Sequence, residues 1–314
     1  MKKNVFTAFL ACLSICCSAQ ESQTAYNFLR LPVSAHIAAI GGDNITIDND
    51  DPTVIFHNPA LISNLSRKMI NLNFMTYMEG AKTGSAAFIK PEGERATWGV
   101  AAQYMNYGSM KMRSINNEDM GDFSAKDIAV SGSFAYALTK HIAGGITARF
   151  ITSFIGGYSS IAMGVDLGVN YYNPNIDLSV SLVARNLGGQ IKAFDEEFDR
   201  IPFDLQLGGS YRFRNMPFRI SATLTRLTDW SDKFLHHVVL GADVFLGENI
   251  WLGAGYNFRR SSEMKIDTGE GNSNRGAGFS FGGGIELERF QLQVAYSKLH
   301  VSANSLIISA SYAL

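Results

Sequence analysis

The stretch that decides the fold covers residues 161–171 and reads IAMGVDLGVNY. Its odd-numbered positions hold large apolar or aromatic residues, namely Ile161, Met163, Val165, Leu167, Val169 and Tyr171. Its even-numbered positions hold small or polar residues, namely Ala162, Gly164, Asp166, Gly168 and Asn170. A period of two residues is typical of a β-strand whose two faces meet different surroundings. We therefore expect one face of this strand to meet an apolar medium and the other a polar one.

The same alternation recurs in about fourteen segments toward the C-terminus. These segments cover residues 68–77, 82–90, 95–107, 124–137, 142–154, 159–171, 176–187, 203–213, 218–228, 236–246, 250–260, 275–287, 290–298 and 305–314. Strands of soluble proteins usually have about 5–6 residues, whereas a tilted bilayer crossing needs about 9–11, which most of these segments reach. An even strand number is typical of bacterial barrels. The sequence therefore predicts an all-β protein, a transmembrane antiparallel β-barrel of about 14 strands over residues 68–314.

The connections between these segments alternate in length. The short ones cover residues 91–94, 138–141, 172–175, 214–217, 247–249 and 288–289, and the longer ones cover residues 108–123, 188–202, 229–235, 261–274 and 299–304. The hairpins at residues 78–81 and 155–158 break the pattern. Outer-membrane barrels have short periplasmic turns and long outer loops. We therefore expect a periplasmic C-terminus and extracellular long loops, in the outer membrane of a Gram-negative bacterium.

Charged residues fall on the polar faces of the predicted strands. They are Arg149, Arg185, Arg212, Asp166, Asp204, Asp243 and Glu286. A barrel lumen tolerates such residues and a lipid face does not. They either line an open pore or pair across strands in a closed lumen. Because both signs occur together, pairing is the better interpretation.

The composition and the first residues narrow the class of protein. The formal net charge is −1 and 46% of the residues are apolar, which argues against a nucleic-acid-binding chain and against a disordered one. Lys2 and Lys3, an apolar run over residues 5–17 and the small pair Ser18-Ala19 predict a signal peptide over residues 1–19. That segment contains every cysteine, so the mature chain is expected to have no disulfide. A lipoprotein acylated at Cys16 or Cys17 is the rival interpretation, although Ile15 is a poor fit before such a site.

Residues 20–67 do not alternate. They contain the glycine pair Gly41-Gly42 and two proline turns, Asp50-Asp51-Pro52 and Asn58-Pro59-Ala60. A segment of this length ahead of the first strand can lie inside the barrel as a plug. It can equally pack below the barrel in the periplasm.

These residues carry a resemblance to a known family. The run at residues 34–42, together with Asp51, Pro52, Asn58, Pro59 and Ala60, resembles the N-terminal region of FadL-like outer-membrane proteins. That resemblance implies a fourteen-stranded barrel in which these five residues form a structural motif of an N-terminal plug. Within that superfamily the chain resembles the PorQ branch of the type IX secretion system of Bacteroidetes. The stretches that carry this second resemblance are residues 26–33, 55–60, 123–127, 184–189 and 255–260.

The resemblance implies a role without enzymatic activity. PorQ-like proteins belong to a cell-surface attachment complex that receives cargo from the translocon, removes its C-terminal signal and attaches it to lipopolysaccharide. The barrel is expected to anchor the surface protein PorZ to the outer membrane. The implied partners are therefore PorZ, other attachment-complex subunits and outer-membrane lipid, and no nucleic acid.

Two loops offer candidate partner-binding residues. The loop at residues 188–202 carries Phe194, Phe198 and Ile201 among charged residues that include Glu196 and Arg200. The loop at residues 229–235 adds Trp230 and Phe234. Exposed apolar anchors within a polar rim suit a protein partner. The alternative is that the first loop folds over its own barrel mouth.

Other chemistry finds little support in the sequence. The six histidines show no metal-ligand spacing, and Asp48, Asp50 and Asp51 fit a turn before Pro52 better than a calcium loop. No catalytic residue, metal site or cofactor is predicted. The alternative function is a FadL-like transport channel for small hydrophobic molecules, which needs an apolar pocket. A continuous apolar lumen would support transport, whereas a lumen packed with paired charges would support the anchor.

Overall fold

The structure is a computed structural model that describes residues 24–47, 50–114, 116, 118–231, 233–264, 266–267, 272–273, 276–301 and 303–314. The predicted signal peptide at residues 1–19, with its three cysteines, lies outside the described residues, as does Asp48.

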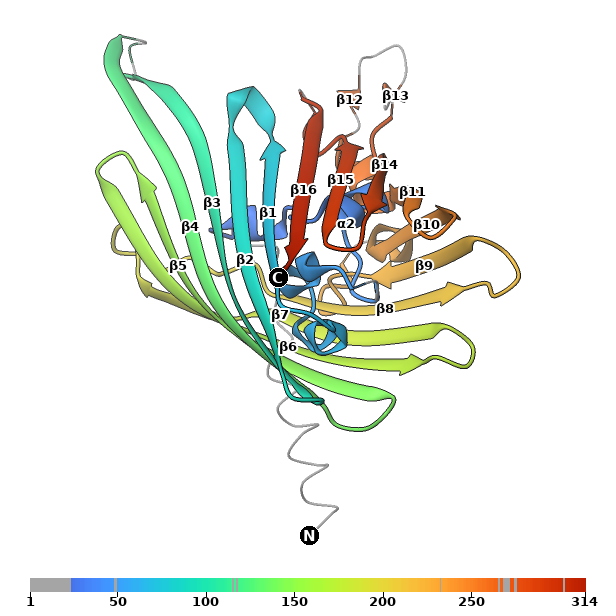
Figure 1. Cartoon of the computed structure of the whole chain (residues 1–314). Helices are drawn as coiled ribbons and strands as arrows, with labels where there is room; N and C mark the ends of the chain where they lie inside the picture. Colours follow the sequence, from blue (N-terminus) through green and yellow to red (C-terminus); the bar gives the residue numbers. More distant parts are fainter. Residues whose placement is uncertain are drawn as a thin grey trace.

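Fourteen antiparallel strands form one closed barrel (Figure 1). They are β1 (Met69–Thr76), β2 (Lys82–Glu92), β3 (Ala96–Arg113), β4 (Asp119–Ala137), β5 (Ile142–Ile155), β6 (Tyr158–Asn173), β7 (Leu178–Lys192), β8 (Asp204–Arg212), β9 (Phe218–Leu224), β10 (Val238–Leu246), β11 (Ile250–Asn257), β14 (Phe279–Glu286), β15 (Phe290–Ser297) and β16 (Ser305–Ala313). Each strand pairs with its neighbours in the chain order, and β1 pairs with β16 from Met69 opposite Ala313 to Met75 opposite Ile307. The predicted fourteen-stranded all-β barrel is confirmed.

The two faces of each strand differ as the alternation predicts. On β6, Met163, Leu167 and Val169 are exposed on the outside, whereas Asp166 and Asn170 are buried. The outward side chains of the other strands are also mostly large and apolar, which suits a surface in contact with lipid. No helix among the described residues is long and apolar enough to span a bilayer.

The two ends of the barrel have different connections. The turns at residues 93–95, 138–141, 174–177, 213–217, 247–249 and 287–289 lie at one end, together with the C-terminal residue of β16. We call this the short-turn end. The connections at residues 193–203, 225–237, 258–278 and 298–304 lie at the opposite end, which we call the long-loop end.

Two strand pairs extend farther than the alternation indicates. β3 and β4 remain paired as far as Arg113 opposite Asp119, so most of the expected loop at residues 108–123 is a strand hairpin. This hairpin projects beyond its neighbours in Figure 1. Backbone pairing continues there although side chains on both faces are exposed, so the sequence loses its alternation before the strands end. β7 likewise runs to Lys192, which shortens the expected loop at residues 188–202.

The connection after β11 contains a helix that the alternation did not predict. The strand ends at Asn257, whose side chain accepts a hydrogen bond from the Arg260 amide at 3.0 Å and caps α3 (Phe258–Glu263). Residues 258–260 were expected to continue the strand, and that expectation is wrong. A short hairpin, β12 (Ile266–Asp267) and β13 (Asn272–Ser273), follows the helix.

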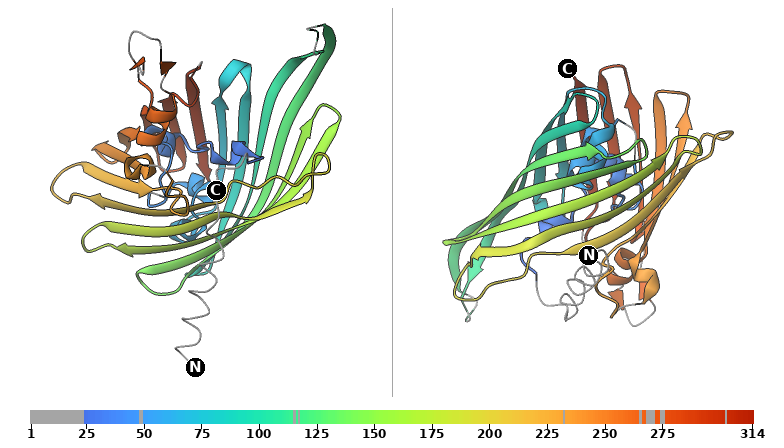
Figure 2. Two further views of the ribbon diagram at one scale, coloured as in Figure 1. Left: turned by 180° about the vertical axis from the view of Figure 1, so that it is seen from behind. Right: turned by 90° about the horizontal axis from the view of Figure 1, so that it is seen from below.

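Residues 24–47 and 50–67 occupy the interior of the barrel, one of the two positions considered for this segment (Figure 2). The segment contains η1 (Asn27–Arg30), α2 (Ala35–Ala39), η2 (Pro52–Phe56) and η3 (Pro59–Asn64). We call it the plug. Its apolar side chains pack with inward-facing residues of the barrel wall in three of the four hydrophobic clusters, for example Ile62 with Ala135 and Phe28 with Met105.

The two proline motifs of the plug begin its 3₁₀ helices. The Asp51 side chain accepts from the Thr53 amide at 2.9 Å and the Asn58 side chain from the Ala60 amide at 3.0 Å, so each is an N-cap. Pro52 and Pro59 follow at the first helical position, where the missing amide hydrogen costs nothing. Ala60 is fully buried in η3. Asn58 also donates to the Ile45 carbonyl and to Ser181 of β7, which joins the motif to the barrel wall.

Two further short elements lie near the long-loop end. The connection after β1 contains η4 (Met78–Gly80), and the connection before β10 contains η5 (Phe234–His237).

Candidate functional site

The lumen holds buried ion pairs. The Arg149 guanidinium on β5 donates to the Asp166 carboxylate on β6 at 2.7 Å and to the Asn186 side chain at 2.6 Å. Both members of the ion pair are buried. The predicted pairing of lumen charges across strands is confirmed for this pair.

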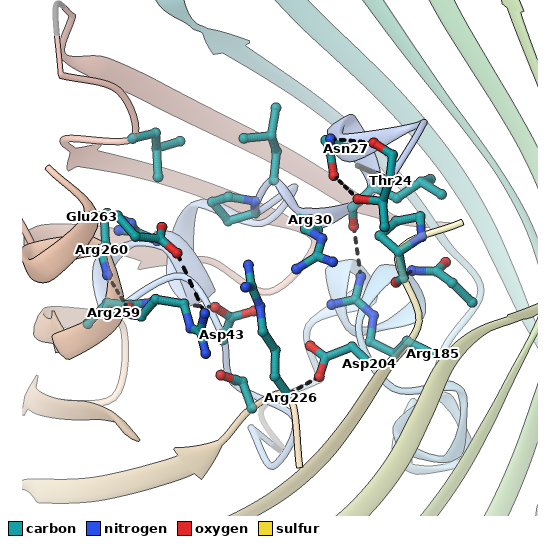
Figure 3. Close-up of a pocket in the computed structure, with 18 of the residues that line it drawn as sticks. Thr24, Asn27, Arg30, Asp43, Arg185, Asp204, Arg226, Arg259, Arg260 and Glu263 are labelled. Atoms are coloured by element: carbon teal, nitrogen blue, oxygen red, sulfur yellow. Dashed lines mark hydrogen bonds and ion pairs between the residues drawn. The ribbon is translucent and has the colours of Figure 1, made fainter. Parts of the chain in front are cut away.

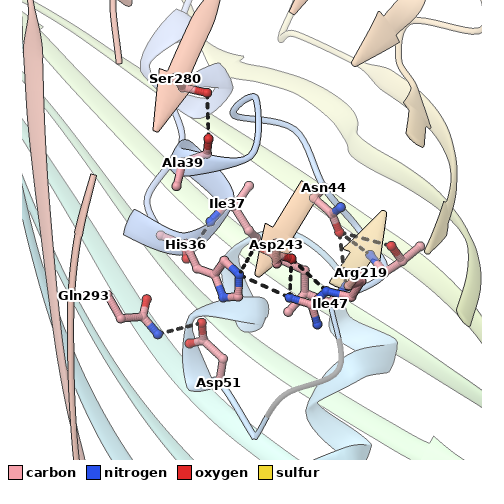
Figure 4. A network of polar contacts seen from close by, with 12 residues as sticks. His36, Ile37, Ala39, Asn44, Ile47, Asp51, Arg219, Asp243, Ser280 and Gln293 are labelled. Carbon is pink, nitrogen blue, oxygen red and sulfur yellow. Dashed lines mark hydrogen bonds and ion pairs between the residues drawn. The ribbon is translucent and has the colours of Figure 1, made fainter. Parts of the chain in front are cut away.

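A second network joins the plug to the wall and includes a histidine that the sequence did not single out. His36 of α2 is fully buried, and its Nε2 lies 3.0 Å from Asp243 Oδ1 on β10. Arg219 on β9 donates to Asp243 Oδ2 through Nη2 at 2.6 Å and through Nε at 2.8 Å (Figure 4). The plug is therefore fixed to β9 and β10 by charge-assisted hydrogen bonds.

Between the plug and the long-loop end lies a cavity of about 540 Å³ (Figure 3). Its walls come from the start of the plug, the middle of β7, the long-loop ends of β8, β9 and β11, and helix α3. Eight of the residues that line it are charged, namely Arg30, Arg185, Arg226, Arg259, Arg260, Asp43, Asp204 and Glu263. Arginines therefore outnumber carboxylates by five to three around this cavity.

The fold holds two of these arginines firmly. Arg185 donates through Nη2 to the carbonyl oxygens of Leu29 and Phe56, both at 3.3 Å. Arg260 donates through Nη1 to the Ser297 hydroxyl at 2.9 Å and through Nη2 to the Gly41 carbonyl at 3.2 Å. A Cβ at Gly42 would lie 2.4 Å from Arg260 Nη2, so only glycine leaves room for this guanidinium.

The three carboxylates are engaged in different ways. Asp204 accepts from the Arg226 backbone amide and from the Gln206 side chain, both at 2.6 Å. Glu263 lies at the rim, 3.6 Å from the guanidinium of Arg259. Asp43 is a plug residue whose pKa is raised, mainly by burial and also by the nearby Asp204 carboxylate, although Arg185, Arg260 and Arg226 oppose the rise.

Sequence reasoning identified only part of this cavity. The alternation assigns Arg185 and Asp204 to the inner face of their strands. Arg30 lies in η1. Arg226, Arg259 and Arg260 fall within the segments expected as strands at residues 218–228 and 250–260, but β9 ends at Leu224 and β11 at Asn257, so the alternation does not indicate their direction. Their convergence follows from the path of the plug.

The predicted partner-binding loop after β7 is partly exposed. Phe198 is 65% exposed, Glu196 and Arg200 are also exposed, and Phe194 is half-buried. Ile201 was expected among the exposed anchors, and that expectation is wrong, because it is buried in a cluster that includes Tyr26 and Phe28.

This loop also holds the start of the plug. The Arg200 carbonyl accepts from the Ala25 amide at 3.0 Å, and Thr24 forms a parallel β-bridge with Arg200. The loop therefore combines an exposed tip with a base packed over its own barrel mouth.

The second predicted loop carries an exposed aromatic pair. Trp230 and Phe234 are 56% and 58% exposed, and their rings stack with centroids 6.4 Å apart and an interplanar angle of 11°. Trp230 also contacts the ring of the buried His237, with centroids 4.8 Å apart. The pair is thus held in one orientation at the long-loop end, on the connection that follows the cavity residue Arg226.

Within the part of the chain that the structure describes, no group of three or more histidine, cysteine, aspartate or glutamate residues could hold a metal ion.

Comparisons with known proteins agree with the barrel architecture. Residues 113–305 match the family described as type IX secretion system membrane protein PorP/SprF. Among solved structures, the Pseudomonas putida toluene transporter TodX superimposes with a TM-score of 0.60 at 12% identity, over 91% of this chain and 99% of TodX. The monoaromatic hydrocarbon channel CymD gives a TM-score of 0.60 at 15% identity, over 90% of this chain and 97% of CymD. No curated protein matches the sequence.

Proposed function

The chain belongs to the type IX secretion system PorP/SprF family of membrane proteins, and from that membership we propose that it is a non-enzymatic outer-membrane anchor of this system. The family and the barrel support an outer-membrane component of the secretion system. We propose in addition that the barrel belongs to the attachment complex as a PorQ-like subunit and that it retains the surface protein PorZ. Its long loops then face the cell exterior and its C-terminus the periplasm, in the usual arrangement of such barrels.

The observation that carries the proposal is the stacked pair Trp230 and Phe234 at the long-loop end. Two large aromatic rings that are each more than half exposed leave apolar area in contact with water. Aromatic residues dominate the binding energy of many protein interfaces. Phe198 offers a third exposed ring on the loop after β7, with Glu196 and Arg200 as polar neighbours.

The paired charges of the lumen favour an anchor over a channel. TodX and CymD are described as a toluene transporter and a monoaromatic hydrocarbon channel, so transport of small hydrophobic molecules is the alternative for this fold. An apolar solute needs an apolar pocket. The buried Arg149–Asp166 and Arg219–Asp243 pairs lie in this lumen, and charged and polar residues make up most of the lining of the cavity.

The test is retention of PorZ by point variants in the native host. A tagged barrel with Trp230→Ala and Phe234→Ala, and a second with Phe198→Ala, are compared with wild type by co-purification and by surface labelling of PorZ. We expect the first variant to release PorZ to the medium and the second to weaken retention. Point substitutions are preferable to deleting the loop because the Arg200 backbone holds the start of the plug.

The matched control replaces exposed apolar residues at the opposite end. Leu138→Ala and Met216→Ala remove side chains that are 57% and 59% exposed in short turns. They are expected to leave PorZ on the surface. Full retention of PorZ by the Trp230 and Phe234 variant would refute the proposed interface, and normal surface PorZ in a strain lacking the barrel would refute the anchor itself.

A further inference from the structure

We propose that the cavity at the long-loop end is a binding site for a phosphoryl group, held by the guanidinium groups of Arg185, Arg226 and Arg260. The proposal concerns the interior of the mouth and does not depend on whether the exposed loops bind PorZ. The ligand class is a phosphomonoester, either a soluble one or the headgroup of a phosphorylated lipid.

The charge of the cavity fits a dianion. Five arginines and three carboxylates line it, which leaves two positive charges in excess. A phosphomonoester carries a charge of about −1.5 to −2 at neutral pH. The Glu263 carboxylate lies beside Arg259 at the rim, and Asp204 accepts its hydrogen bonds from a backbone amide and a side-chain amide. Asp43 lies near Arg185, Arg226 and Arg260, so the three carboxylates together leave the cavity with two positive charges in excess.

The surroundings of Arg185 support the site independently of the net charge of the cavity. Arg185 is buried, with 6% of the residue exposed, and it lines the cavity. Among the described residues its hydrogen bonds go to two neutral carbonyl oxygens at 3.3 Å, and its Nε is buried without a partner. Buried cations are normally paired with an anion, because a desolvated guanidinium without one is costly. Asp43 is near this guanidinium but makes no hydrogen bond to it, and an oxyanion in the cavity would place a negative charge directly against it.

Arg260 and Arg226 approach from other elements. Arg260 belongs to α3 and makes its side-chain hydrogen bonds to a serine hydroxyl and a backbone carbonyl. Burial lowers the pKa of Arg260, although Asp43 and Glu263 oppose this effect, so its cationic form also gains from a nearby anion. Arg226 follows β9 with its backbone held by Asp204. Figure 3 shows these side chains around one space, with Arg185 on the far side from Arg260.

The arrangement suits a phosphoryl group better than a carboxylate. Each guanidinium presents a planar fork of donors that matches two oxygens of an anion. Forks that come from β7, the loop after β9 and α3 can each bind a different face of a tetrahedral group, whereas a planar carboxylate offers only two oxygens. The rest of the wall includes Leu29, Leu31 and Pro202, which can contact the small organic group of a phosphomonoester. The volume of about 540 Å³ lies in the range of small-molecule sites, about 300–1,000 Å³.

The test is calorimetric titration of the full chain in detergent with inorganic phosphate and with glycerol 3-phosphate. Both are expected to bind, glycerol is not, and acetate is expected to bind more weakly than phosphate. Arg226→Gln and Arg185→Gln are each expected to lower the affinity for glycerol 3-phosphate by about tenfold or more, as removal of a charged hydrogen bond does. Arg226→Gln keeps the carbonyl contacts of Arg185, so it tests the site even if the Arg185 variant disturbs the plug.

The matched control is Arg214→Gln. Arg214 is exposed at the short-turn end and, like Arg185, donates through Nη2 to a backbone carbonyl, that of Pro174 at 3.2 Å. This variant is expected to bind glycerol 3-phosphate like wild type. Heat-dependent gel mobility shows for every variant that the barrel is folded.

A second arm separates the two sources of the phosphoryl group. The chain is placed in nanodiscs with or without phosphatidic acid and analysed by native mass spectrometry, and glycerol 3-phosphate is added as a competitor. Retention of phosphatidic acid by wild type and its loss in Arg226→Gln assigns the site to a lipid headgroup, whereas binding of glycerol 3-phosphate alone assigns it to a soluble phosphomonoester. The proposal is overturned if folded wild type binds none of these phosphates, or if both cavity variants bind them as Arg214→Gln does.

Discussion

The imidazole of His36 stacks on the indole of Trp251 with ring centroids 3.8 Å apart and an interplanar angle of 17°. His36 belongs to the plug and Trp251 to β11, and both side chains are fully buried. The same imidazole contacts Asp243, which in turn binds Arg219. One residue thus connects the plug to three neighbouring strands, through the face of its ring and through its Nε2 atom. Because of this contact, the stability of the barrel depends on the position of the plug.

The first prediction concerns the acidic centre of that network. Asp243→Asn leaves Arg219 and His36 in the lumen without their buried carboxylate. Because removal of one partner leaves an uncompensated buried charge, we expect a loss of about 3–5 kcal/mol in stability. The measurement is the temperature at which the detergent-solubilised barrel loses its folded gel mobility. The double variant Arg219→Met and Asp243→Leu removes both charges and is expected to be more stable than Asp243→Asn; equal or lower stability would contradict the argument.

The second prediction concerns the fit of the Asn58-Pro59-Ala60 motif. A Cβ at Gly168 of β6 would lie 2.3 Å from Asn58 Oδ1, the atom that caps η3. Gly168→Ala is therefore expected to displace the cap and to cost about 1–3 kcal/mol, as overpacking of a core does. Faster proteolytic cleavage within residues 24–67 and a lower unfolding temperature would report this displacement. Gly132→Ala on β4 is the matched control, because nothing lies within 4 Å of the Cβ it adds.

Much of the barrel follows from side-chain alternation alone. Strand periodicity is a local property, so residues 161–171 are enough to identify the lipid and lumen faces of β6. The predicted strand ends were wrong where backbone pairing continues without alternation, and where it stops before the alternation does. Residues 109–111 and 113 of β3 pair with β4 beyond the expected strand end, and residues 258–260 leave the strand because Asn257 caps a helix.

The candidate site depends on contacts that no local pattern encodes. Arg185 could be assigned to the lumen from its parity on β7, whereas Arg260 reaches the cavity only because Gly42 of the plug leaves space for it. Ile201 shows the opposite case. An apolar residue in a charged loop resembles an exposed anchor in the sequence, but in the structure the plug covers it. The route of residues 24–67 through the barrel is the information that the sequence does not display.

The third prediction is a dependence on pH that originates at His57. This plug residue is buried, and both of its ring nitrogens lack a partner among the residues described. Burial, with a further effect of Arg185 and Arg149, lowers the pKa of His57 well below its ordinary 6.5. The unfolded chain therefore binds a proton on this residue as the pH falls below about 6.5 while the folded chain does not, so stability is complete above that pH and decreases below it.

His57→Leu removes this titration and breaks no hydrogen bond of the ring. We expect the variant to lose less stability than wild type between pH 7 and pH 5, measured as the shift in unfolding temperature. His141→Leu replaces an exposed histidine at the short-turn end and should keep the wild-type dependence on pH. An unchanged pH profile in His57→Leu would show that other groups cause the acid sensitivity.

The last prediction tests the contact of the barrel with lipid. Leu167 lies in the middle of β6 on the outer face and is 45% exposed, so the chemistry of its surroundings decides what an added charge costs. In a bilayer an arginine near the midplane of a barrel strand costs about 2–4 kcal/mol, and the cost decreases to about 0–1 kcal/mol near the interfaces. Leu167→Arg is therefore expected to reduce folding into lipid vesicles strongly. Tyr158→Arg, at the long-loop end of the same strand, should fold nearly as well as wild type. The measurement is the folded fraction on gels across a urea titration in vesicles. Equal effects of the two substitutions would mean that the middle of β6 does not lie deeper in the bilayer than its end.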